Sequence, residues 1–179
     1  MSAYTGKDIA RAFRGVRSHT IEIANEIPGD KYGFSAAPDT RTVAQLLAHI
    51  AFIPRIQRLL HSGSPESLAG FDFRKFMGEL AADESQPRTK AEIIELLKKE
   101  GEDFATWVEA LSDDFLAQHM PQPAGQTPAS KSRLEMLLSP KEHEMHHRAQ
   151  LMLIERQLGI VPHLTRARQA AMAATAARS

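Results

Sequence analysis

Apolar residues recur at three- and four-residue intervals in four long stretches of this sequence, and segments rich in proline and glycine separate them. This spacing places the apolar side chains on one face of an α-helix, which must be buried against another element. No stretch is a convincing strand. The sequence therefore predicts an all-α protein whose four long helices form a four-helix bundle. The helices are expected at about residues 7–27, 39–62, 89–111 and 130–158.

Residues that accept hydrogen bonds from unpaired amides mark the expected helix starts. Asp39 or Thr40 is expected to cap the second helix, and Ser130 the fourth. Residues 89–92 have the Thr-x-x-Glu form of a capping box, which predicts the start of the third. Residues 71–80 favour a further short helix on the flank of the bundle.

Two prolines fall inside the expected helices. Proline donates no amide hydrogen and its ring clashes with the preceding turn, so Pro54 should kink the second helix. For Pro140 we expect either a kink or a new helix start near Ser139, because proline suits the first helical turn.

Composition excludes several classes of site and partner. The chain has 179 residues, as expected for one domain, and no cysteine, so imidazole and carboxylate are its strong metal ligands. The 22 basic and 22 acidic residues balance, which argues against a nucleic-acid partner. The N-terminus lacks an apolar secretory core, and no stretch approaches the roughly 20 apolar residues of a membrane span. We therefore expect a cytoplasmic protein with no membrane partner.

Three histidines are candidate metal ligands. His143 and His147 are one helical turn apart and share an arc of roughly 80° with the apolar positions that follow them, so both should point into the core. His49 shares its face of the second helix with apolar residues and should also point inward.

A buried imidazole with unpaired nitrogens costs about 1–3 kcal/mol for each bare polar group. A divalent ion bound by all three rings removes that cost and leaves a fourth position open for water or substrate, which is the pattern of catalytic zinc sites. The alternative is that the three histidines are hydrogen-bonded packing residues, since the His-x-x-x-His spacing also occurs by chance.

Other polar residues have less defined expectations. Glu144 is a weak catalytic candidate, as a general base or as an acceptor for an imidazole N–H, although a helical glutamate is usually solvated. His61, His119 and His163 lie at helix ends or in loops and are expected to be exposed. No nucleotide or other organic cofactor site is expected.

Three stretches together resemble the DinB/YfiT-like superfamily of bacterial metal-dependent enzymes: residues 27–32, residues 42–50, and residues 143–151 followed by 158–162. The resemblance implies an up-down-down-up bundle whose metal, nickel or zinc, is bound by His49, His143 and His147. It further implies a homodimer and kinship with thiol-dependent transferases and isomerases.

On this basis we expect residues 1–162 to form the bundle domain and residues 163–179 a tail or short helix. The first hypothesis is a metal-dependent enzyme acting on a small-molecule substrate, by thiol-dependent transfer or isomerisation or by hydrolysis. The second is a non-catalytic dimeric bundle module whose histidines are structural. A fold alone does not separate the two, because function resides in the site.

Overall fold

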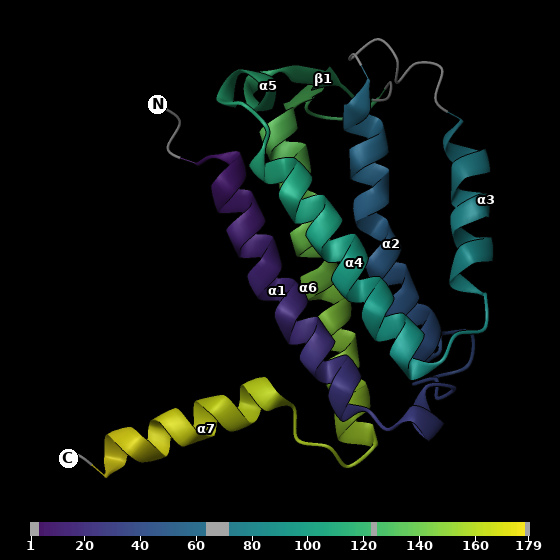
Figure 1. The fold of residues 1–179 in the computed structure, drawn as a ribbon, viewed down its shortest axis with the longest axis vertical. Helices are drawn as coiled ribbons and strands as arrows, with labels where there is room; N and C mark the ends of the chain where they lie inside the picture. The colour runs from purple at the N-terminus through teal and green to yellow at the C-terminus, as the bar shows by residue number, and fades with distance from the viewer. Residues whose placement is uncertain (1–3, 64–71, 123–124, 178–179) are drawn as a thin grey trace.

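Four long helices dominate the computed structural model, which describes residues 4–63, 72–122 and 125–177 (Figure 1). Their bounds are Gly6–Glu26 (α1), Val43–Ser62 (α2), Lys90–Glu109 (α4) and Arg133–Gln157 (α6). In Figure 1, α1 and α6 run downward along the chain, whereas α2 and α4 run upward. The expected all-α class is confirmed. None of the described helices is long and apolar enough to cross a membrane.

The four helices bury their apolar faces against one another. Helices α1 and α2 each pack against both α4 and α6. At one end of the core, the rings of Phe13 and Phe104 meet edge to face with centroids 4.8 Å apart, and Trp107 packs beside them. Further along, Leu47 and Leu97 are fully buried in a second cluster shared by all four helices.

The helix starts follow side-chain caps, but two of the caps differ from expectation. Thr42, not Asp39 or Thr40, caps α2. Its hydroxyl accepts from the backbone N–H of Gln45, and the side-chain oxygen of Gln45 accepts from the backbone N–H of Thr42. Ser132, not Ser130, caps α6 by accepting from the Glu135 amide at 3.1 Å. The capping box at the start of α4 is confirmed.

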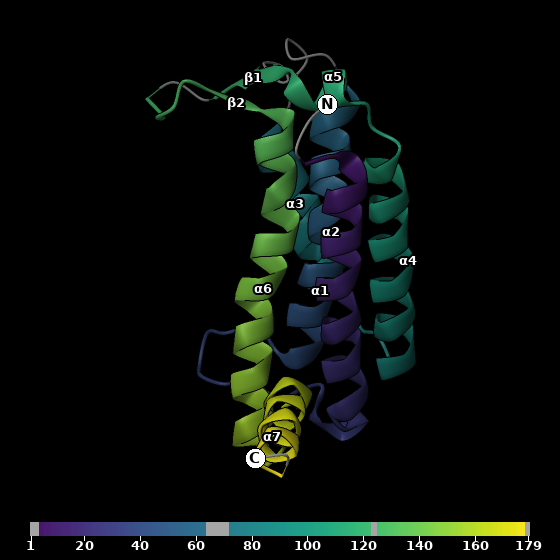
Figure 2. The same ribbon diagram turned by 90° about the vertical axis from the view of Figure 1, so that its left-hand side faces the viewer.

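Smaller elements connect and flank the bundle. Helix α3 (Phe73–Glu84) lies beside α2, which confirms the expected flanking helix, although residue 71 lies outside the described residues. The remaining helical segments are a 3₁₀ turn, Gly29–Lys31 (η1), the short helix Asp113–Ala117 (α5), and the C-terminal helix His163–Ala176 (α7). Figure 2 shows α7 at the lower end of the bundle.

A two-stranded antiparallel sheet corrects the expectation that the chain has no strand. His119–Pro121 (β1) pairs with Ser130–Ser132 (β2) at the upper end of the bundle (Figure 2). Each strand has three residues. An alternating pattern is not recognisable over three residues in a segment rich in proline, so periodicity could not predict these strands.

Both helical prolines are accommodated within continuous helices. Pro54 lies inside α2 as expected, and Pro140 lies inside α6, seven residues after its first residue, Arg133. The expected new helix start near Ser139 is therefore wrong. Pro140 is buried, so packing of its ring accompanies the loss of one backbone hydrogen bond.

Arg17 of α1 forms hydrogen bonds with each of the other three long helices. Arg17 is 4 % exposed, and its guanidinium donates to the Glu144 carboxylate of α6. It also donates to the backbone carbonyls of Leu97 in α4 and Ile50 in α2, at 2.8 and 3.1 Å. This buried charge is balanced and its hydrogen-bonding groups are satisfied, as a core charge requires.

Glu155 near the end of α6 should make stability depend on pH. Burial, together with the neighbouring Glu26 carboxylate, raises the pKa of Glu155 to about 7. Between its ordinary pKa and this value, the unfolded chain loses a proton that the folded chain keeps, so stability falls as pH rises through this window. Glu155→Gln should therefore stabilise the protein at pH 8 by roughly 1–3 kcal/mol and change little at pH 4.

Urea denaturation at the two pH values measures this difference. Glu142→Gln, an exposed substitution on the same helix, is the matched control and should have no comparable effect. Equal stability of Glu155→Gln and the parent at pH 8 would contradict the argument.

Candidate metal centre

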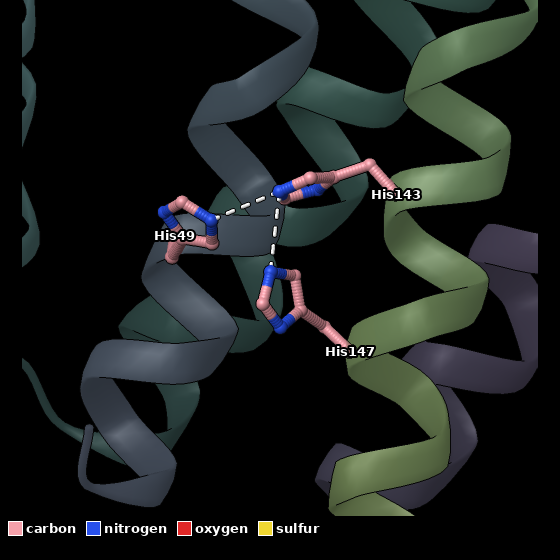
Figure 3. Close-up of side chains that lie close together, drawn as sticks. All are labelled: His49, His143 and His147. Atoms are coloured by element: carbon pink, nitrogen blue, oxygen red, sulfur yellow. Dashed lines mark hydrogen bonds between the residues drawn. The ribbon is translucent and has the colours of Figure 1, made fainter. Parts of the chain in front are cut away.

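The structure brings His49, His143 and His147 together between α2 and α6. Figure 3 shows the three rings pointing toward a common point, one from α2 and two from successive turns of α6. The Nε2 atom of His143 is 3.1 Å from Nε2 of His49 and 3.1 Å from Nε2 of His147. Two segments almost a hundred residues apart in the sequence thus converge through the same ring nitrogen.

A carboxylate from α3 orients His49. Its Nδ1 lies 2.5 Å from Oε1 of Glu84, so the Nδ1–H donates to the carboxylate and leaves a lone pair on Nε2. Arg41 donates to the other carboxylate oxygen at 3.1 Å. Burial alone would raise the pKa of Glu84, but the hydrogen bonds from His49 and Arg41 outweigh it and hold that pKa below its usual value.

Gln150 orients His147 in the same way. The Nδ1–H of His147 donates to the Gln150 side-chain oxygen at 2.8 Å, and the Gln150 amide nitrogen donates to Nε2 of His146 at 3.2 Å. Nε2 of His147 is therefore also left with its lone pair directed at the common point. Gln150 is three residues after His147, so the two share a helix face.

His143 is the ring without a satisfied arrangement. Its Nδ1 is buried and has no hydrogen-bond partner among the described residues. If its proton sits on Nδ1, that N–H is bare and three lone pairs meet at Nε2; if it sits on Nε2, the bare atom is an acceptor. Burial first, then the neighbouring His147 and His49, lower the pKa of His143 to about 4. Burial also lowers the pKa of His147.

This arrangement fits a divalent ion. Nitrogens about 2.0–2.1 Å from a tetrahedral zinc lie roughly 3.3 Å apart, close to the observed 3.1 Å separations. Two of the rings already hold the required tautomer through Glu84 and Gln150. Burial lowers the pKa of His143 and of His147, which favours the neutral form of these two rings at pH 7. The donor set is nitrogen only, which suits zinc, nickel or copper better than magnesium or calcium.

A cavity opens beside the three histidines. It has a volume of about 760 Å³, and His147, Glu84 and Gln150 form part of its wall. Arg41 and Leu153 also line it, so a cationic and an apolar group face the same space. A small molecule in this cavity would contact the His147 ring, and also Glu84 and Gln150, which orient His49 and His147.

Glu144, the weak catalytic candidate from the sequence, accepts hydrogen bonds from Arg17 and not from an imidazole. It is 1 % exposed and forms the ion pair with Arg17, with Oε2 of Glu144 2.9 Å from Nη2 of Arg17. The carboxylate is therefore neither solvated nor the acceptor for a ligand imidazole. Glu84, which sequence reasoning did not single out, is that acceptor, because α3 folds back along α2 and no periodic pattern reports this placement.

Of the three histidines that were expected to be exposed, two are buried. His119 is exposed as expected. His61 is 1 % exposed and receives a hydrogen bond from the buried Arg133, and burial followed by this neighbouring charge lowers the pKa of His61 to about 4. His163 is 6 % exposed at the start of α7. A residue at the end of a helix is therefore buried when another element packs over it.

Both the fold and the sequence of this chain are similar to those of known proteins. Two solved structures are similar: a DinB-like protein from Bacillus subtilis, with 21 % identity, a TM-score of 0.62, and coverage of 84 % of this chain and 91 % of the other, and a DinB-like protein from Bacillus cereus, with 15 % identity, a TM-score of 0.66, and coverage of 87 % and 93 %. A comparison with curated proteins gave no match. The family model of the DinB superfamily matches residues 12–151, which include the three converging histidines. The chain therefore belongs to the DinB superfamily.

Proposed function

We propose that this protein binds a divalent metal ion through His49, His143 and His147 and uses it in a reaction on a small molecule. The observation that carries the proposal is that Nε2 of His143 lies 3.1 Å from Nε2 of both His49 and His147, while Nδ1 of His49 and of His147 is engaged by Glu84 and Gln150. Packing histidines have no need of this shared orientation. Nickel and zinc are the ions that the family resemblance favours.

The cavity supports a catalytic over a purely structural centre. A bound ion supplies a Lewis acid that lowers the pKa of a protic group such as water or a thiol. Glu84 and Gln150 fix the tautomers of two ligands, and Arg41 and Leu153 offer a cationic and an apolar contact to a substrate in the 760 Å³ space. Thiol-dependent transfer or isomerisation and hydrolysis both fit such a site.

The proposal also includes the domain limits and the assembly. We place the metal-binding domain at residues 1–162 and treat residues 163–179 as an appended segment that contains α7. By resemblance to the family, we propose a homodimer. Light scattering of the purified protein tests the assembly.

The metal centre is tested by elemental analysis of protein purified without a histidine tag. We expect nickel or zinc in the parent, and the loss of one ion per chain in His147→Ala, because two imidazoles remain where three were present. His119→Ala, which removes an exposed histidine away from this centre, is the control and should retain the parental metal content.

Two results would contradict the proposal. One is a parent protein that takes up no ion at this centre even after incubation with nickel or zinc. The other is an unchanged metal content in His147→Ala. The reaction is tested separately, with metal-loaded protein offered thiol and electrophile pairs and simple esters. Failure with every substrate, combined with stoichiometric metal, would leave the non-catalytic module as the better account.

A further inference from the structure

A second group of metal-ligating side chains lies where α7 meets α1. His163, the first residue of α7, faces His19 and Glu22 of α1. Its Nε2 is 3.0 Å from Nδ1 of His19 and 3.5 Å from Oε2 of Glu22. One potential ligand atom from each of the three residues lies within 4.8 Å of the other two. The three-histidine centre shares none of these side chains.

The His163 ring is not satisfied by its protein contacts. It is 6 % exposed, and its Nδ1 is buried without a hydrogen-bond partner among the described residues. A proton on Nε2 can be donated to His19 but leaves Nδ1 as a bare acceptor. A proton on Nδ1 leaves that N–H bare, while Nε2 can accept from Nδ1–H of His19 at 3.0 Å. Either neutral tautomer leaves one buried polar atom unpaired, which is unfavourable.

We propose that His19, Glu22 and His163 form a second divalent-cation site, suited to zinc. Two imidazole nitrogens and one carboxylate oxygen are a ligand set that zinc accepts, with about 2.0–2.2 Å to each atom. The 3.0 Å separation of the two nitrogens is near the spacing that such distances require. His19 is half-buried and Glu22 is exposed, so the site is open to solvent on the α1 side and an ion can enter.

The site would fasten α7 to the bundle. His163 is the buried residue of α7. Two further contacts of this helix are exposed: Arg166 pairs with Glu26 of α1, and Thr165 accepts from Arg156 of α6 at 3.0 Å. Exposed pairs of this kind contribute little to stability, because solvent screens them. An ion bound by residues of both α1 and α7 would therefore link the two helices more strongly than the exposed Arg166–Glu26 pair.

The test uses a background in which the first centre is removed, His143→Ala/His147→Ala. Isothermal titration with zinc should show one ion per chain in this background. Adding His163→Ala or His19→Ala should abolish that binding, and adding His119→Ala should leave it unchanged. Circular dichroism verifies that each variant is folded. Glu22→Gln changes an exposed residue and leaves the buried His163 ring intact, and it should weaken zinc binding.

Proteolysis gives a second measurement in the same background. Trypsin cleaves after Arg166 and Arg168 when α7 opens. If the open form binds no zinc, a concentration about 100 times the dissociation constant should slow this cleavage roughly a hundredfold, and His163→Ala should remove the effect. Absence of zinc binding in the folded background, or binding that His163→Ala and His19→Ala leave unchanged, would overturn the second site. Neither result bears on the three-histidine centre, which this background lacks.

Discussion

Arg17→Ala is expected to lower the free energy of unfolding by about 3–5 kcal/mol. The substitution leaves the Glu144 carboxylate, which is 1 % exposed, without its counter-charge. It also removes the donors to the carbonyls of Leu97 and Ile50. Breaking one side of a buried ion pair is far more destabilising than the pair itself is stabilising, because the remaining charge stays buried.

Urea denaturation measures this effect, and the same helix provides its control. Arg14 forms ion pairs with Glu102 and Glu109 at the surface, both at 2.7 Å. Arg14→Ala should cost only about 0–1 kcal/mol, since solvent screens such pairs. A double substitution, Arg17→Met with Glu144→Met, should recover much of the loss because no unpaired charge remains. Similar losses for Arg14→Ala and Arg17→Ala would refute the argument.

Glu84→Gln is expected to raise the dissociation constant for the metal ion by about 10- to 100-fold, although Glu84 is not one of the three proposed ligands. The carboxylate accepts from Nδ1 of His49 and so keeps the lone pair on Nε2. An amide lacks the charge that strengthens this hydrogen bond, and its NH₂ group can donate to Nδ1 and favour the wrong tautomer. This prediction depends on the proposed three-histidine centre.

Competition with a chromophoric chelator measures the dissociation constant. Glu79→Gln is the control: it is on the same helix, its side chain is 65 % exposed, and it should leave the affinity unchanged. Equal affinities for Glu84→Gln and the parent would show that this carboxylate does not support the ligand. A loss of unfolding free energy without a change in affinity would assign Glu84 to packing.

The local order of the fold was largely predictable from sequence. Helical periodicity located the four long helices, and the capping box at residues 89–92 marked the start of α4. The predicted helix starts were wrong where several possible capping residues lie close together in sequence. Thr42, and not Asp39 or Thr40, caps α2, because Thr42 and Gln45 form a reciprocal pair of hydrogen bonds. Propensity alone does not distinguish these neighbours.

Of the candidate site, only the three histidines were predictable from sequence; the residues that contact them were not. His49, His143 and His147 lie on apolar helix faces, and that periodicity predicted their convergence. Glu84 and Arg41 could not be found in this way, because their positions depend on how α3 and the loop before α2 fold back on the bundle. Glu144 was misjudged for a related reason: its partner, Arg17, comes from a helix 127 residues away in sequence.

Helix α3 lies outside the four long helices, yet it supplies Glu84 to His49 and, with Ala81 and Ser85, one wall of the cavity. Few of its side chains are buried: Leu80 and Glu84 are the buried residues of this helix. A displacement of α3 would therefore widen the entrance for a substrate and release the His49 ring in one movement. In the proposed centre, the width of the cavity entrance and the basicity of the His49 ring would both depend on the position of this one helix.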